Sequence, residues 1–236
     1  MHAFASPAPG WSGPSQQHVL PGPSAGTLDG LLAGRSVVRR TLRKREYVFH
    51  AGQPRRSLFL VHAGVFKTSL LSADGRERIT GFRFRGDVLG LDAFDLDRHR
   101  CDAVALDVGE VWELPCDAAV EIGPDLARCI ASMLAGEVRR DWNWMLTLGT
   151  LDAEQRVVAF LLDLADRMEA LGYSAQRFSL RMTRAEIASF LALKLETVTR
   201  ALTRLHGRGL IAVDGRHVDI LDARGMRDRL AVRRCH

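Results

Sequence analysis

The sequence predicts an α+β protein with a strand-rich first half, a long central helix and a helical C-terminal part that ends in a hairpin. Three observations lead to this prediction. Short runs of strand-forming residues alternate with glycine turns from about residue 40 to residue 115. A stretch of helical periodicity follows residue 124. Further helix patterns and a second hairpin pattern then occupy residues 151 to 221.

The composition allows several functions and excludes a few. Hydrophobic residues make up 47% of the 236 residues and charged residues 26%, which is ordinary for a globular protein. The net charge of +5 is compatible with a nucleic-acid partner. No run approaches the ~18 apolar residues of a membrane-spanning helix, and the first residues lack the pattern of a secretory signal. We therefore expect a cytoplasmic protein with no membrane partner.

The first 34 residues are predicted to be a disordered leader. Residues 1–26 contain no Asp, Glu, Lys or Arg and hold five of the eight prolines. Such a segment buries too little apolar surface to offset the entropy lost on ordering.

Residues 35–122 are predicted to form a jelly-roll-like domain of short strands. Asp74-Gly75 lies between two of the runs and is a typical hairpin turn. The expected strands are Leu58–Val61, Val65–Leu71, Ile79–Phe84, Ala103–Leu106 and Val111–Leu114. A cupin-type β-barrel enzyme would need clustered His and Glu ligands. His50, His62 and His99 lack the spacing of a metal site, so we expect no metal.

Residues 123–150 are predicted to form a helix that pairs with a second copy of the chain. Apolar positions recur at alternating spacings of three and four residues, which is a heptad pattern. The alternative is a single amphipathic helix that lies on its own domain. Asp141 interrupts the apolar pattern, so a parallel pair would bring two carboxylates together, unless the helix is rotated and Asp141 is solvated. The predicted dimerisation residues are Leu134, Val138, Asp141, Met145 and Leu148.

Residues 151–230 are predicted to form a winged helix-turn-helix. A helix ends at Gly172, and Thr183 and Glu186 then form a capping box at the start of a short helix. A tight turn leads into a second helix, Leu195–Leu205, which a hairpin at residues 210–221 follows. Helix, tight turn, helix and hairpin in this order are typical of a DNA-binding unit.

The second helix carries side chains suited to reading base pairs. Glu196, Thr199 and Arg200 share the face opposite the apolar positions. Arg can bind guanine, Glu can accept from cytosine, and Thr can pack on a thymine methyl. An exposed ion pair between Glu196 and Arg200 is the alternative. The complete set of predicted DNA contacts is Lys194, Glu196, Thr197, Thr199, Arg200, Thr203, Arg204 and Arg208.

These motifs resemble the cyclic-AMP receptor/FNR family of bacterial transcription regulators over residues 40–222, and the FNR branch in particular. Glu196-Thr197-Val198-Thr199-Arg200 is similar to the Glu-x-x-Ser-Arg reading motif of that branch. Similar positions are 81–82, 86–93, 136–138, Asp141 and 153–156. The resemblance implies a β-roll sensory domain, a dimerisation helix and a winged DNA-binding domain. It also implies binding to palindromic double-stranded DNA with TTGAT-like half-sites and a contact with RNA polymerase. We expect an activator, although the sequence alone leaves activation and repression both open.

Two departures from the family pattern concern cofactors. The Glu that binds cyclic nucleotide in some members falls at Leu91, so we expect no cyclic AMP binding. The cysteines that hold an iron–sulfur cluster in oxygen-sensing members are absent from the leader, and the internal one falls at Trp112, so we expect no cluster.

The four cysteines leave room for a redox signal. Cys101 follows Arg98, His99 and Arg100, and these would favour a reactive thiolate if the thiol were exposed. The alternative is an inert, partly buried cysteine. The sequence therefore predicts a dimeric, non-enzymatic, FNR-type regulator that responds to an oxygen- or redox-related or other small signal. The competing interpretations are a protein-interaction adaptor and a cupin-type enzyme.

Overall fold

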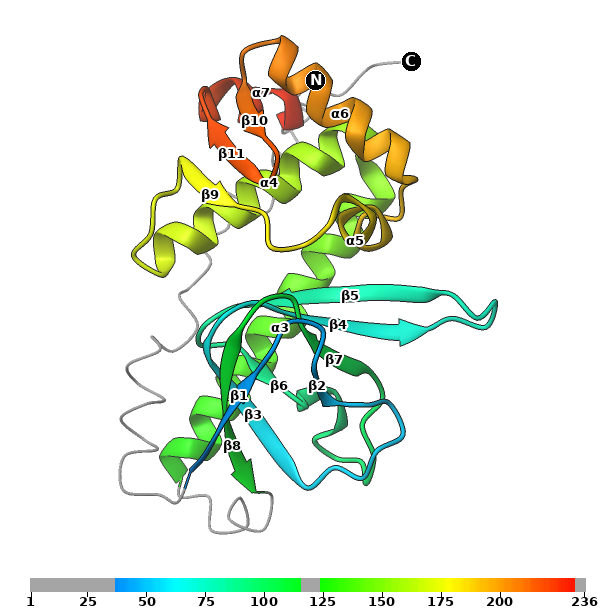
Figure 1. Cartoon of the computed structure of the whole chain (residues 1–236), viewed down its shortest axis with the longest axis vertical. Helices are drawn as coiled ribbons and strands as arrows, with labels where there is room; N and C mark the ends of the chain where they lie inside the picture. Colours follow the sequence, from blue (N-terminus) through cyan, green and yellow to red (C-terminus); the bar gives the residue numbers. More distant parts are fainter. Residues whose placement is uncertain (1–36, 116–123, 232–236) are drawn as a thin grey trace, which may run out of the picture.

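The computed structural model describes residues 37–115 and 124–231 (Figure 1). A β-roll lies at one end of the molecule, and the C-terminal helices with a small sheet lie at the other. The long helix α3 (Pro124–Thr150) connects the two. The predicted α+β architecture is confirmed. The expected leader, residues 1–34, lies outside the described residues.

The strands before residue 115 form two four-stranded antiparallel sheets, with the orders β1-β8-β3-β6 and β2-β7-β4-β5. All five strands expected from the sequence are present. Three others, β1, β2 and β6, were not predicted, and a short 3-10 helix (Leu91–Ala93) follows β6. The bounds are β1 Val38–Leu42, β2 Tyr47–Phe49, β3 Ser57–Ala63, β4 Phe66–Leu71, β5 Glu77–Arg83, β6 Val88–Leu89, β7 Asp102–Ala105 and β8 Gly109–Pro115.

Strand β3 shows why the β-roll needs an apolar sequence. Successive side chains of a strand point to opposite faces. Phe59 and Val61 lie in the core between the two sheets. Leu58 and Leu60 lie on the other face of β3, in a cluster that includes Ile130 of α3. Both faces of β3 are therefore covered, which explains its continuous run of hydrophobic residues.

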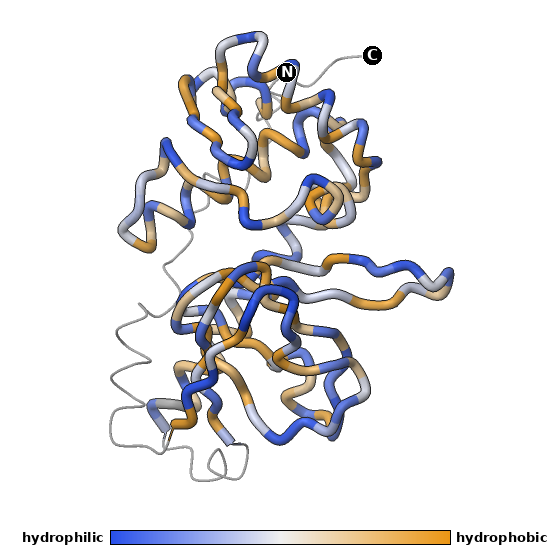
Figure 2. The backbone as a smooth tube through the Cα atoms, viewed as in Figure 1, coloured by the Kyte–Doolittle hydropathy of each residue, from blue (hydrophilic) through white to orange (hydrophobic). Residues whose placement is uncertain are grey.

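The hairpins that join the strands have defined turns. The β4–β5 hairpin closes at Asp74-Gly75 as expected, with a backbone hydrogen bond from Gly75 to Ser72. Figure 2 shows hydrophilic residues at the tip of this projecting hairpin. Between β3 and β4, Gly64 has a φ of +89°, and a Cβ there would lie 2.7 Å from the Cα of Gly109. Only glycine fits this close approach of two backbones.

The C-terminal part has the predicted order of helix, helix-turn-helix and hairpin. Helix α4 starts at Asp152, whose side chain forms a capping box with Gln155. The hairpin is joined by β9, an additional strand that pairs with β11. The elements are α4 Ala153–Ala170, β9 Arg177–Ser179, α5 Arg184–Phe190, α6 Leu195–Gly207, β10 Ile211–Asp214, β11 His217–Ile220 and α7 Ala223–Ala231.

One hydrophobic core connects the β-roll, α3 and the C-terminal part. It includes Phe82 of β5, Trp144 of α3, Phe160 of α4 and Phe190 of α5. The contacting rings in this aromatic cluster have centroids 4.8 to 6.4 Å apart. The helix-turn-helix is therefore packed against the β-roll. None of the described helices combines the length and the apolar character needed to span a membrane.

Candidate nucleic-acid interface

The turn between α5 and α6 is set by the sequence at both ends of α5. Thr183 Oγ1 accepts a hydrogen bond from the Glu186 amide, and the Glu186 carboxylate accepts one from the Thr183 amide. This capping box confirms the predicted start of α5. At the other end, Ala192 adopts a φ of +52°, which turns the chain within three residues into α6. Two helices with a fixed angle between them result.

Helix α6 has one buried and one exposed face. Val198, Leu202 and Leu205 are each at most 3% exposed and hold the helix on the domain. Glu196, Arg200 and Thr203 are exposed on the opposite face, and Thr197 and Thr199 are half-buried beside them. This division of α6 follows the 3.6-residue period that predicted it.

The charged side chains at the start of α6 are free to meet a ligand. Among the described residues, neither Glu196 nor Arg200 forms a hydrogen bond or an ion pair, so the expected alternative of a mutual ion pair is not formed. Lys194, at the N-cap, is exposed as well. A helix that presents Glu and Arg in its first two turns can enter the major groove and bind base edges.

Arg204 and Arg208 are already engaged within the domain. Arg208 is paired with Glu154 of α4, and Arg204 lies 4.0 Å from the same carboxylate. Arg229 of α7 also binds Glu154, at 2.9 Å. Glu154 thus ties the end of α6 and α7 to α4. The two arginines predicted to hold phosphates therefore also have a role in the packing of the domain.

The hairpin supplies one residue that the sequence interpretation missed. β10 and β11 pair from Ile211↔Ile220 to Asp214↔His217, and Asp214-Gly215-Arg216 forms the exposed turn. Arg216 is at the tip of the wing, where its side chain can reach a phosphate. Its position directly after an Asp-Gly turn was the available signal.

Comparison with known proteins agrees with this geometry. Residues 39–122 match the family model of the cyclic nucleotide-binding domain, and residues 155–229 match that of the Crp-like helix-turn-helix domain. The transcriptional activator protein anr of Pseudomonas aeruginosa is 38% identical over 187 residues, which cover 78% of this chain and 77% of that protein. This chain belongs to the CRP/FNR family of transcription regulators.

Other relatives place the protein within that family. Electron transport regulator A of Shewanella oneidensis is 36% identical over 187 residues, covering 78% of this chain and 75% of the relative. The solved structure of FixK2 from Bradyrhizobium japonicum is similar with a TM-score of 0.74 and 31% identity, over 82% of this chain and 96% of FixK2. The protein is thus a DNA-binding regulator of the FNR/Anr type, and its matched relatives are regulators, not enzymes.

The long helix of this CRP/FNR protein has an exposed apolar face. Val138 and Met145 are 44% and 65% exposed, and Asp141 is exposed next to them. Leu134 and Leu148 are half-buried, with Leu134 packed against the β-roll. Trp142, which the sequence interpretation did not single out, is 60% exposed. The exposed pattern therefore runs through Trp142, one residue after Asp141.

A half-buried ionic network lies where the β-roll, α3 and α4 meet. The Asp87 carboxylate accepts a hydrogen bond from the Phe84 amide and lies 3.6 Å from both Arg140 of α3 and Arg167 of α4. Burial alone would raise the pKa of Asp87, but the guanidinium groups around it lower the pKa below its ordinary value. Arg167 is held in turn by Asp163 at 3.2 Å. Asp87 thus joins the β-roll to both helices.

A second set of contacts ties α5 to the β4–β5 hairpin. Lys67 Nζ lies 2.9 Å from Glu77 and 3.2 Å from Glu186. The Ser189 hydroxyl accepts a hydrogen bond from the Ile79 amide. Glu186 therefore both caps α5 and binds Lys67 of the β-roll.

The cavity between the β-roll and α3 has a mixed ionic lining. Its volume is about 190 Å³, and it contains Arg83, Arg100, Asp92, Glu137 and Asp141. Arg83 and Glu137 form an ion pair across it, while burial raises the pKa of the Glu137 carboxyl. Leu91, at the position where some family members carry a Glu, also lines the cavity.

Cys101 does not have the properties expected of a reactive thiolate. The residue is only 6% exposed. Burial, and then the nearby Asp92 carboxylate, raise the pKa of the Cys101 thiol. The flanking basic residues do not compensate, since Arg98 donates to the Gly52 carbonyl. Burial and local electrostatics thus favour the inert cysteine that the sequence left as the alternative, and a redox role of Cys101 stays a prediction.

Proposed function

We propose that this protein is a dimeric activator that reads palindromic DNA with TTGAT-like half-sites. Glu196 and Arg200 at the start of α6, both exposed and without an ion-pair partner among the described residues, carry the proposal. Arg200 would bind the half-site guanine through O6 and N7, Glu196 would accept from cytosine N4, and Thr199 would pack on a thymine methyl. Two copies are needed because each α6 reads one half-site. The exposed face of α3 around Val138 and Met145 supports the pairing.

The signal we propose is an oxygen- or redox-related or other small signal, and the partner that transmits activation is RNA polymerase. The names of relatives support this: one is an activator, one an "anaerobic regulatory protein" and one an electron transport regulator.

The described residues argue against the two usual cofactors of the family. A cluster needs neighbouring thiolates, whereas the two cysteines among the described residues, Cys101 and Cys129, are buried in separate hydrophobic clusters. A cyclic phosphodiester is an anion, and the cavity beside α3 presents three carboxylates (Asp92, Glu137 and Asp141) against two guanidinium groups, of which Arg83 is already paired with Glu137 and Arg100 remains. We therefore propose that the protein uses neither an iron–sulfur cluster nor cyclic AMP.

Fluorescence anisotropy with a labelled palindromic TTGAT duplex tests the DNA proposal. At one fixed salt concentration, Arg200→Ala should weaken binding to the cognate site by about 1–3 kcal/mol and leave weak, salt-sensitive binding to unrelated DNA. Arg224→Ala is the matched control, because Arg224 of α7 is exposed and its substitution changes the net charge by the same amount. An Arg200→Ala protein that still distinguishes the half-site guanine as wild type does would refute the assignment. Absence of any DNA binding by the wild type would favour the adaptor.

Two measurements test the cofactor proposal. Iron and sulfide analysis of anaerobically purified protein should find no stoichiometric cluster. Calorimetric titration with cyclic AMP should show no binding at micromolar concentrations.

A further inference from the structure

A second cavity lies in the β-roll, away from α3 and from the helix-turn-helix. It opens between the two sheets at the edge where β1 and β2 lie, and its volume is about 250 Å³. Its lining residues come from β1, β2, the β2–β3 loop, β3, β8 and the segment before β7. The cavity shares no lining residue with the one beside α3.

Aromatic rings form the wall of this inter-sheet cavity. Phe49 and Phe59 are buried, with ring centroids 5.7 Å apart. His99 is stacked on Phe49 at 3.6 Å with an angle of 9° between the rings. Burial lowers the pKa of His99, so its imidazole is neutral and contributes a flat, weakly polar surface at neutral pH. Such a wall suits a planar apolar group.

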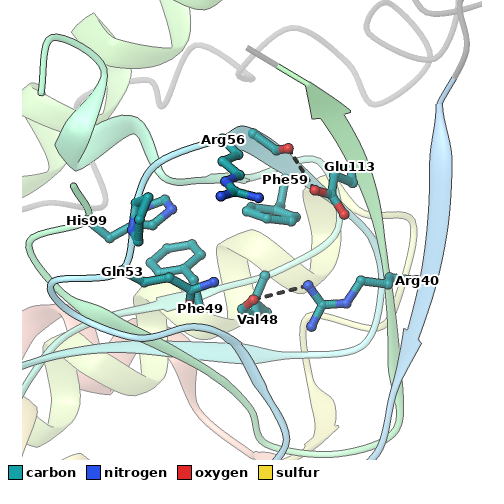
Figure 3. Close-up of a pocket in the computed structure, with 10 residues that line it drawn as sticks. Arg40, Val48, Phe49, Gln53, Arg56, Phe59, His99 and Glu113 are labelled. Carbon is teal, nitrogen blue, oxygen red and sulfur yellow. Dashed lines mark hydrogen bonds between the residues drawn. The ribbon is translucent and has the colours of Figure 1, made fainter. Parts of the chain in front are cut away.

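Two guanidinium groups and one carboxylate give the lining a net positive charge. Arg40 is held in place by hydrogen bonds to the Val48 and Tyr47 carbonyls and lies 5.9 Å from the Phe59 ring centre. Arg56 forms no ion pair or hydrogen bond with any described residue. Figure 3 shows Arg56, His99 and Glu113 around a common space above the two phenylalanines. The Glu113 carboxylate accepts a hydrogen bond from the Ser57 hydroxyl.

One buried polar atom at the cavity wall is unsatisfied. His99 Nδ1 has no hydrogen-bond partner among the described residues. Buried polar atoms are normally paired with protein or solvent. A residue that lines the cavity therefore keeps an unused hydrogen-bonding atom.

We propose that this inter-sheet cavity binds a small organic carboxylate with a planar, apolar body. Arg56 would pair with the carboxylate, and the rings of Phe49 and His99 would contact the apolar body. The cavity is smaller than the roughly 300–1,000 Å³ of sites for drug-sized ligands, so the body is limited to about one ring. The segment Arg98–Cys101 connects this site to the cavity beside α3, because His99 lines the first and Arg100 and Cys101 line the second.

Calorimetric titration of the full chain with sodium benzoate tests this site. Benzoate should bind at millimolar concentrations. Benzamide, which keeps the ring without the charge, and inorganic phosphate, which keeps a charge without the ring, should each bind at least about tenfold more weakly. If phosphate bound as tightly as benzoate, the site would bind anions without selecting for the ring, and the proposal would be overturned. Absence of benzoate binding would overturn it as well.

Substitutions of opposite charge locate the ligand. Arg56→Gln should weaken benzoate binding at least about tenfold, while Glu113→Gln should strengthen it, because the variant removes the one carboxylate of the lining. His99→Phe keeps the ring stack and tests the imidazole, with weaker binding expected. Arg100→Gln is the control, since Arg100 lines the other cavity. If Arg100→Gln lost benzoate binding while Arg56→Gln kept the affinity of the wild type, benzoate would bind beside α3, and the inter-sheet site would be refuted.

Discussion

Replacing Asp87 by Asn should destabilise the protein more than any comparable surface change. The substitution keeps the shape of the side chain and removes its charge. Arg140 and Arg167 then face each other without the carboxylate that lies 3.6 Å from each of them. Breaking a buried ion pair by removing one partner typically costs about 3–5 kcal/mol. The Asp87 side chain is 21% exposed, and Arg167 retains its ion pair with Asp163 in the variant. We therefore expect the free energy of unfolding to fall by an amount near the lower end of this range, about 3 kcal/mol.

The pH dependence of that loss follows from the lowered pKa of Asp87. A lowered pKa in the folded state stabilises the protein at every pH above the unfolded-state pKa of about 3.9. The contribution disappears as the pH falls through the folded-state pKa. The difference between wild type and Asp87→Asn should therefore be constant from pH 7 to pH 5 and shrink below about pH 4.

Urea denaturation followed by circular dichroism measures this difference. Asp95→Asn is the matched control, because Asp95 is exposed, and it should change the free energy of unfolding by less than about 0.5 kcal/mol. If Asp87→Asn and Asp95→Asn gave the same unfolding midpoint at pH 7, the ionic network would contribute nothing to stability.

Three further predictions concern the other charged and reactive groups. Cys101, with its raised pKa and 6% exposure, should react with iodoacetamide at neutral pH only after the protein is unfolded; rapid alkylation of the native protein would restore the redox hypothesis. Asp141→Ala should strengthen dimerisation and, through it, DNA affinity; identical dissociation constants in analytical ultracentrifugation would place Asp141 away from the dimer contact. Lys67→Met should lower the free energy of unfolding by about 2 kcal/mol and speed hydrogen exchange in α5, because Glu186 loses its ion pair with Lys67. Unchanged exchange in α5 would show that this ion pair does not anchor the helix.

The elements that the sequence predicted are those with a strong local signal. The helix-turn-helix was predicted closely because the Thr183–Glu186 capping box and the apolar period of α6 are encoded within a few residues. Strand β1 was missed since its two arginines hide the alternation that marks a strand. In the structure Arg40 is satisfied by carbonyls of the next strand, a contact that only the tertiary fold creates.

The candidate site shows the same limit. Glu196 and Arg200 were found because spacing alone places them on the exposed face of α6. The heptad pattern predicted an exposed face on α3, but Leu134 turned out to be half-buried and Trp142 exposed. The heptad pattern does not fix the rotation of α3 about its axis. That rotation depends on which side chains the β-roll covers, and the local sequence does not show this. The pairing of Arg204 and Arg208 with Glu154 likewise joins positions some 50 residues apart, which spacing does not reveal.

The aromatic cluster of Phe82, Trp144, Phe160 and Phe190 has a practical consequence for anyone who divides this chain into fragments. A fragment that begins at Asp152 would keep Phe160 and Phe190 and lose the two rings that cover them. Its newly bared aromatic surface would favour self-association. Weak or erratic DNA binding by such a fragment would then reflect its aggregation and say little about how the intact protein binds DNA.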